Sequence, residues 1–256
     1  MAKIQVVRIF KYTNKKKSVF IGFLLLIFVL SFFSFHKNKI IIWSWERNED
    51  LTFLNRNVFV SYYAGSVILK NGRMSISERT QPLKLNSDTK VIPVVRIDNF
   101  DNAEDLTAQR IQSIGDFIIE MCNREQVVGC QIDFDAKTSE KPAYTSLISL
   151  VRDKLPKNIP LSITALVSWC DKYSWINDTK IDFAIPMFYR LGPDKNSIRN
   201  GYTGQTFMKS SKCANSIGIS TDEPLPMRKY IGNRDIYVFN PNSWNEEGFE
   251  RIIRAI

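Results

Sequence analysis

Two aspartates placed two positions apart form the motif in this sequence with the clearest chemical potential. They end the stretch Val128 to Asp135, VGCQIDFD, in which polar and apolar residues alternate. In a β-strand this alternation puts Gln131, Asp133 and Asp135 on one face. Two carboxyl groups this close cannot both ionise cheaply, so one of them should have a raised pKa. We therefore predict that Asp135 is a general acid and that Asp133 tunes and orients it.

The same pair also has a purely structural interpretation. The aspartates could cap the turn that follows the strand, or they could form ion pairs with Arg96 or Arg190. A second catalytic carboxylate could come from another strand end, at Glu46, Asp98 or Glu223. Both interpretations remain open from the sequence.

The residue types exclude several other chemistries. His36 is the only histidine, so a histidine-based catalytic triad or a His-ligated metal is excluded within this chain. The four cysteines show neither CxxC pairs nor the density of a disulfide framework, so we expect no structural zinc site. Buried free thiols or a single bridge are the favoured interpretation, and no cofactor is expected. The four are Cys122, Cys130, Cys170 and Cys213.

Eight short runs rich in β-branched residues predict strands. Between them, apolar residues recur at helical spacing from Ile111 to Met121 and from Tyr144 to Leu155, and Glu246 to Ile256 reads as a closing helix. The pair Asn71-Gly72 predicts a hairpin after the second run. The eight runs are Ile40 to Glu46, Val58 to Leu69, Val91 to Asp98, Val127 to Asp135, Leu161 to Cys170, Ile181 to Arg190, Ile217 to Asp222 and Ile236 to Asn240.

Strands joined mostly by helices predict an α/β fold with parallel pairing, and eight of them predict a compact (β/α)₈ barrel of the TIM type. A doubly wound open sheet is the alternative. In such a barrel the carboxyl ends of the strands form one face, where substrates bind. The polar residues expected there, and therefore predicted to bind substrate, are Glu46, Arg96, Asp98, Gln131, Arg190, Asp222 and Glu223.

The N-terminal region predicts membrane targeting. Val19 to Phe35 is an uncharged apolar run of 17 residues, about the shortest helix that crosses a bilayer. Basic residues before the run outnumber those just after it, which predicts a cytoplasmic N-terminus. Cleavage as a signal peptide is the alternative, although no small-x-small site precedes Lys37. The predicted parts are a cytoplasmic basic segment (1–18), a transmembrane signal-anchor (19–35) and a periplasmic or extracellular barrel domain (36–256).

The net charge of +9 does not indicate a nucleic-acid partner. Eight of the 35 Lys and Arg residues lie in residues 1–39, which contain no acid. The rest of the chain has 27 bases against 26 acids, so the basic excess belongs to targeting.

The aspartate strand resembles the DGxDxDxE signature of chitinase-like glycoside hydrolases. Gly129 matches its glycine, Asp133 its final aspartate, and Asp135 falls on the catalytic glutamate, while Val128 and Gln131 replace its two earlier aspartates. The resemblance implies a sugar substrate. It also implies that Tyr189, in a Met-x-Tyr-like stretch, and Trp244, where such barrels place a tryptophan floor, contact that sugar. For Trp43 and Trp45, core packing is the favoured interpretation.

The domain also resembles a bacterial family of uncharacterised proteins for which a glycosidase-like barrel has been proposed. The resembling stretches span nearly all of residues 40–244, and they imply a fold without an activity. They are Ile42 to Arg47, Gln131 to Ala136, Leu161 to Cys170, Ile219 to Pro224 and Tyr237 to Pro241.

Together these observations predict a membrane-anchored, glycoside hydrolase-like barrel of the cell envelope that acts on a polysaccharide or glycan. A non-catalytic glycan-binding barrel is the competing hypothesis, because two motif carboxylates are missing. A structural envelope protein without a ligand is a third. Retention, inversion and substrate assistance all stay open as mechanisms.

Overall fold

The computed structural model describes residues 38–171, 174–192, 209–223 and 231–256. Apart from residues 1–37, the chain forms one compact unit, residues 38–256. The predicted transmembrane segment, residues 19–35, lies outside the described residues. Within the described ranges, none of the helices combines the length and the apolar character needed to cross a bilayer.

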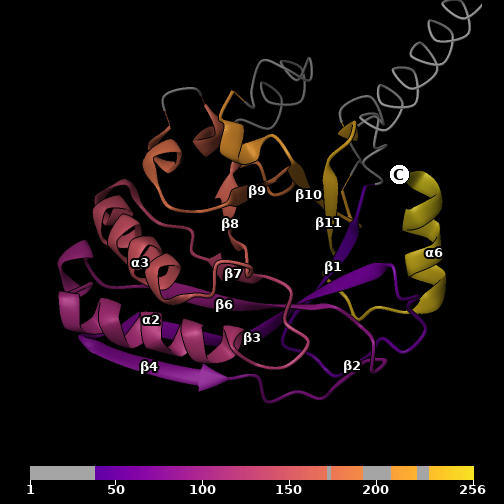
Figure 1. The fold of residues 1–256 in the computed structure, drawn as a ribbon, viewed down its shortest axis with the longest axis horizontal. Helices are drawn as coiled ribbons and strands as arrows, with labels where there is room; N and C mark the ends of the chain where they lie inside the picture. The colour runs from indigo at the N-terminus through magenta and orange to yellow at the C-terminus, as the bar shows by residue number, and fades with distance from the viewer. Residues whose placement is uncertain (1–37, 172–173, 193–208, 224–230) are drawn as a thin grey trace, which may run out of the picture. The chain divides into compact units, whose positions relative to one another are not determined.

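The described unit is a closed barrel of eight parallel strands (Figure 1). Each strand pairs with its neighbours along the chain, and the first pairs with both the second and the last, which closes the sheet. The predicted barrel is therefore confirmed, and the open sheet is wrong. The strands are β1 (Ile40–Ser44), β3 (Val58–Lys70), β6 (Val91–Asn99), β7 (Cys130–Asp133), β8 (Leu161–Leu166), β9 (Phe183–Met187), β10 (Ser216–Ser220) and β11 (Asp235–Phe239).

The predicted hairpin is confirmed at the tip of β3. Asn71 and Gly72 both have positive φ, 55° and 70°, as a type I′ turn requires. The turn leads into β4 (Arg73–Glu78), which pairs antiparallel with β3 outside the closed barrel. The Asp101 carboxylate accepts both turn N–H groups, at 2.7 and 2.8 Å, and so holds the tip against the loop after β6.

Fewer connections are α-helical than predicted in the described part of the chain. Helices α2 (Ala108–Cys122) and α3 (Lys141–Lys154) follow β6 and β7, pack on each other outside the barrel, and bury the predicted apolar faces (Figure 1). Helix α6 (Glu246–Ala255) follows β11. The other elements are η1 (Ala103–Asp105), η2 (Thr138–Glu140), η3 (Val167–Cys170), η4 (Trp175–Asp178), η6 (Ser211–Cys213) and a separate two-stranded sheet of β2 (Glu49–Asp50) and β5 (Leu83–Lys84).

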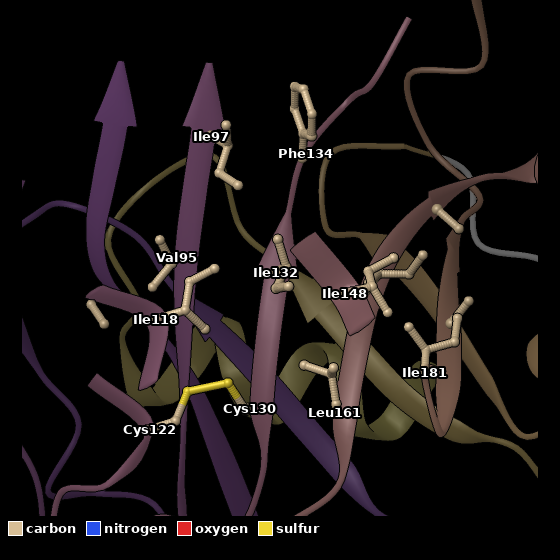
Figure 2. Packing of buried hydrophobic residues seen from close by; sticks show 14 of the residues in the cluster. Val95, Ile97, Ile118, Cys122, Cys130, Ile132, Phe134, Ile148, Leu161 and Ile181 are labelled. Atoms are coloured by element: carbon tan, nitrogen blue, oxygen red, sulfur yellow. A yellow bond between two sulfur atoms is a disulfide. The ribbon is translucent and has the colours of Figure 1, made fainter. Parts of the chain in front are cut away.

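Alternation along the strands divides the interior into an outer and an inner core. Cys130, Ile132 and Phe134 face outward, where Ile132 packs in the same cluster as Ile118 of α2 and Ile148 of α3 (Figure 2). The alternation predicted for the aspartate strand is therefore confirmed over Cys130–Asp133. It also directs the opposite side chains into the barrel lumen.

The cysteine prediction was wrong, because the chain contains two disulfides rather than free thiols or one bridge. Cys122 of α2 is bonded to Cys130 of β7, as Figure 2 shows, and Cys170 is bonded to Cys213. The second bridge closes a separation of 43 residues. Such a pairing depends on how β8 and β10 are placed in the barrel, which cysteine spacing does not reveal.

Large rings fill the lower lumen and set the floor for the space above. Trp43, Ile185 and Tyr237 belong to the inner core, and the Trp43 and Tyr237 rings lie 5.3 Å apart. Gly218 of β10 makes room for the indole, since a Cβ there would lie 3.0 Å from a Trp43 ring carbon. These large side chains therefore fill the lower part of the barrel interior, and the space at the carboxyl ends of the strands stays open.

Candidate functional site

A cavity of about 540 Å³ opens at the carboxyl ends of the barrel strands. Carboxylates, one arginine and several aromatic rings line it, drawn from strands all around the barrel. Its lining residues are Trp43, Trp45, Glu46, Tyr63, Ser66, Ile68, Arg96, Asp98, Asp133, Thr164, Met187, Tyr189 and Phe239. Parallel strands bring these side chains together because their carboxyl ends meet at one rim.

Arg96 is the hub of the acidic side of the cavity. Its Nε and Nη2 donate to Asp98 Oδ1, at 3.0 and 2.9 Å, and its Nη1 donates to Asp133 Oδ2 at 2.8 Å. Its Nη2 also lies 3.5 Å from Asp135 Oδ2. Burial opposes the charge of the guanidinium, but the Asp133 and Asp98 carboxylates outweigh burial and raise the pKa of Arg96.

The two aspartates of the motif have different surroundings. Asp133, the last residue of β7, is 5% exposed and also accepts a 2.5 Å hydrogen bond from Thr164 Oγ1 of β8. Asp135 lies two residues beyond the strand, is 47% exposed and is not part of the cavity lining, although it lies 3.5 Å from Arg96, which is. Partial burial and the neighbouring Asp133 carboxylate raise the pKa of Asp135, with Arg96 acting in the opposite direction. One carboxyl is therefore fixed, and the other is suited to carry a proton.

Glu46 lies beyond β1 and faces the same cavity. Its Oε1 accepts hydrogen bonds from Thr80 N (2.9 Å), Thr80 Oγ1 (2.8 Å) and Gln81 N (3.0 Å). Burial would raise the pKa of Glu46, but the hydrogen bonds from Thr80 and Gln81 outweigh it and lower that pKa. The pKa of Glu46 is thus lowered, whereas that of Asp135 is raised.

Aromatic rings form the wall that borders Glu46. Tyr189 and Phe239 are stacked, with ring centroids 5.5 Å apart and planes 7° apart. Trp45 lies 6.4 Å from Phe239 and 5.7 Å from Tyr63. Faces of this kind suit a flat ring or a sugar, whose C–H groups meet the π-surface.

Three predicted residues form a separate cluster on the rim. Arg190 donates from Nη2 to Asp222 Oδ2 at 2.6 Å, and from both its backbone N and Nη1 to Glu223 Oε1 at 2.8 Å. Arg190 adopts a positive φ of 53°, which is uncommon outside glycine. These side chains lie near the carboxyl ends of β9 and β10, but they are not part of the cavity lining.

Two predicted substrate contacts lie away from the cavity. Gln131 is completely buried beneath it, where its Oε1 accepts from Ser61 Oγ at 2.8 Å and from Trp43 Nε1 at 3.4 Å. Trp244 is not a floor of the cavity: its Nε1 donates to Trp43 O at 2.9 Å and its ring packs against Phe249 of α6. The chain turns outward after β11, so this indole joins the outer core.

Sequence reasoning missed eight residues of the lining, and for two of them, Trp43 and Trp45, it favoured core packing. Alternation from neighbouring strands could have placed Thr164, Met187 and Phe239 in the lumen. Tyr63, Ser66 and Ile68 could not be found in this way, because β3 has a register shift between Tyr63 and Gly65 that breaks the alternation.

Within the described ranges, no group of three or more His, Cys, Asp or Glu side chains is arranged to hold a metal ion. Asp98 and Asp133 of the cavity contact Arg96, and Glu46 accepts hydrogen bonds from Thr80 and Gln81. Carboxyl groups beside an aromatic surface can bind a polar ring and transfer a proton to it.

Comparisons with known proteins add a partial family match. Residues 88–177 match a family described as a domain of unknown function, DUF3142. The matched stretch contains Arg96, Asp98, Asp133 and Asp135, although the resemblance was expected over nearly all of residues 40–244. No curated protein matches the chain. Among solved structures, the spore cortex-lytic enzyme SleL of Bacillus cereus is similar, with a TM-score of 0.44 and 16% identity over 72% of this chain; the chain spans 50% of that structure's length.

Proposed function

We propose that this barrel is a glycoside hydrolase-like protein that acts on a polysaccharide or another glycan, with Asp135 as its general acid. The observation that supports the proposal most strongly is a carboxyl of raised pKa, Asp135, that contacts Arg96 in the lining of a cavity walled by aromatic rings. Glycosidic bonds break when the leaving oxygen is protonated, and aromatic rings hold sugars in place.

In the proposed mechanism, protonated Asp135 gives its proton to the glycosidic oxygen. Asp133 is fixed by Arg96 and Thr164, and its charge adds to partial burial in raising the pKa of Asp135. Asp135 also occupies the position of the catalytic acid in the chitinase-like signature, one methylene shorter than the glutamate there. Its half-exposed side chain leaves room for a substrate to approach.

The second carboxylate of the proposed mechanism would be Asp98 or Glu46, because both line the cavity, whereas Glu223 is held by Arg190 on the rim. Its separation from Asp135 in a substrate complex determines the outcome. About 5 to 5.5 Å gives retention of configuration, and about 6.5 to 9.5 Å leaves space for a water and gives inversion.

The domain is proposed to act outside the cytoplasm, anchored by residues 19–35. Two disulfides support this location, because disulfides persist in oxidising compartments and are rare in the cytosol. The glycan would then belong to the cell envelope or its surroundings.

A non-catalytic glycan-binding barrel is the second candidate. Arg96 contacts Asp98, Asp133 and Asp135 together, and an arginine that neutralises all three would leave a polar binding surface without an acid. The 3.5 Å separation from Asp135 is the longest of the three contacts, which favours the hydrolytic proposal.

The test is a screen of the purified full chain against cell-wall and exopolysaccharide substrates. Both binding and the release of new reducing ends would be measured. Release supports hydrolysis, binding without release supports the glycan-binding candidate, and a failure to bind any glycan rejects both.

A further inference from the structure

The charged side chains that line the cavity give it a net negative charge. Glu46, Asp98 and Asp133 face one cation, Arg96, among the described lining residues. Arg96 is already bonded to Asp98 and Asp133, so it has no unopposed positive charge to offer an anionic ligand. An acidic sugar would enter against this charge, whereas a cationic one would be attracted.

Glu46 leaves one oxygen of its carboxylate unused. Oε1 takes all three hydrogen bonds from Thr80 and Gln81, while Oε2 is buried and has no hydrogen-bond partner within the described part of the chain. A buried anionic oxygen without a donor is costly. A ligand that donates a hydrogen bond to Glu46 Oε2 would remove this cost.

The nearest arginine does not fill this role. Arg79 lies close enough to influence Glu46 electrostatically. However, its hydrogen bonds go to backbone carbonyls, from Nε to Gln81 O at 2.8 Å and from Nη1 to Trp45 O at 2.7 Å. It fixes the backbone on both sides of the Glu46 carboxylate and donates no hydrogen bond to Oε2.

The wall beside Glu46 suits a cation. Trp45, Tyr63 and Phe239 line the cavity together with Glu46, and the three rings contact one another through Trp45. Aromatic faces attract ammonium groups through the ring quadrupole, and the attraction grows when the cation is desolvated. A carboxylate beside such rings is the arrangement expected for a ligand ammonium.

We infer that the glycan bound in this cavity carries free amino groups, and that Glu46 and the aromatic wall bind one of them as an ammonium ion. This inference rests on the proposed function and specifies its substrate class, a polymer of deacetylated hexosamine. The ammonium donates one N–H to Glu46 Oε2 and makes a cation–π contact with the Trp45 ring. The neutral acetylated sugar lacks that charge, and a uronic acid has the opposite one.

The experiment compares three oligosaccharides of equal length by titration calorimetry with the purified full chain: glucosamine, N-acetylglucosamine and galacturonic acid oligomers. The pH is set so that the amines are protonated. Glu46→Gln keeps an oxygen for Thr80 and Gln81 and removes the charge at Oε2. Glu120→Gln, on the exposed outer face of α2, is the matched control.

Wild-type chain and Glu120→Gln should bind the glucosamine oligomer at least about tenfold more tightly than the acetylated one. Glu46→Gln should lose most of that preference while binding the acetylated oligomer as before. Equal or tighter binding of the acetylated or acidic oligomer by the wild type would overturn the inference and leave the glycan function standing. An unchanged preference in Glu46→Gln would also overturn it, and binding of none of the three by a folded chain would reject it.

Discussion

The guanidinium of Arg96 lies 3.5 Å from the carboxyl of Asp135, whereas its contact with Asp133 measures 2.8 Å. One arginine therefore holds the buried aspartate firmly and the half-exposed one loosely. This difference lets two carboxyl groups two residues apart take separate roles, because only Asp133 is held by a short hydrogen bond from the guanidinium. The proposed division into a fixed Asp133 and a proton-carrying Asp135 follows from it.

Arg96→Gln should destabilise the domain by about 2 to 4 kcal/mol, because it leaves the buried Asp133 without its partner and brings three carboxylates together unopposed. The range is set below that of a fully buried pair because the Arg96 side chain is 28% exposed. Urea denaturation measures the effect.

Arg124→Gln is the control for this prediction. It breaks the ion pair between Arg124 and Glu78, whose side chains are 43% and 51% exposed. The free energy of unfolding should fall by less than about 1 kcal/mol. Equal losses in the two variants would mean that Arg96 is not an electrostatic hub.

The raised pKa of Asp135 predicts a pH-dependent stability. A carboxyl whose pKa is higher in the folded than in the unfolded state favours folding at low pH, and that contribution is lost as the pH rises through the folded pKa. Asp135→Asn should therefore be more stable than the wild type at neutral pH, by less than about 1 kcal/mol because the side chain is half exposed.

The difference should disappear below about pH 3.9, where the wild-type side chain is protonated in both states. Denaturation of the two proteins over a pH series measures it. A variant that is less stable at neutral pH than the wild type would show that Asp135 is a stabilising ion-pair partner instead.

The sequence predicted the barrel well because its strands carry local signals. All eight predicted runs contain the observed strands, or overlap them within a residue or two, and Asn71-Gly72 predicted its own turn. Alternation along the run predicted the cavity position of Asp133, whereas Asp135, expected on the same face, lies beyond the end of β7 and outside the cavity lining. The Arg96 contact with Asp133 was foreseen only as an alternative, since it joins two strands.

What the sequence did not predict depends on the path of the chain between strands. Trp244 follows β11 as closely as Trp45 follows β1, yet one indole lies in the outer core and the other lines the cavity. The register shift after Tyr63 brings Ser66 and Ile68 to the lumen, and nothing in the local sequence marks it except Gly65. The pairing of Cys170 with Cys213 also depends on the path of the chain between strands, which the local sequence does not reveal.

The two disulfides should contribute unequally to stability. Cys170–Cys213 spans 43 residues and Cys122–Cys130 only 8. Loop-closure entropy therefore predicts a loss of about 4 kcal/mol for Cys170→Ala with Cys213→Ala, and about 2.5 kcal/mol for Cys122→Ala with Cys130→Ala. All four side chains are buried, so the two double variants leave comparable voids. Denaturation midpoints test the order, and a larger loss from the shorter loop would contradict it.

The charge distribution around residues 19–35 predicts an exported C-terminus. A reporter that is active only outside the cytoplasm, fused after Ile256, should be active. The full-length protein should also stay in the membrane fraction after a high-salt wash. Activity of a cytoplasmic reporter would contradict the orientation, and release of a shortened soluble form would favour signal-peptide cleavage.

Asp135→Glu tests the proposed relation to the chitinase-like site. The longer side chain reaches one methylene further and restores the residue type of that signature, so turnover should be retained or increased. Turnover is measured on the glycan that the screen identifies. A loss as large as that of Asp135→Asn would show that the carboxyl position is specific to aspartate in this barrel.

The most direct test of the account is turnover of that glycan by Asp135→Asn. The amide keeps the shape of the side chain but cannot deliver the proton, so the turnover rate should fall by about 10² to 10⁴ while the melting temperature stays at or above the wild-type value. Asp133→Asn should lower the rate more than it weakens binding. Wild-type turnover by a folded Asp135→Asn protein would contradict the central claim, because another group would then be the acid.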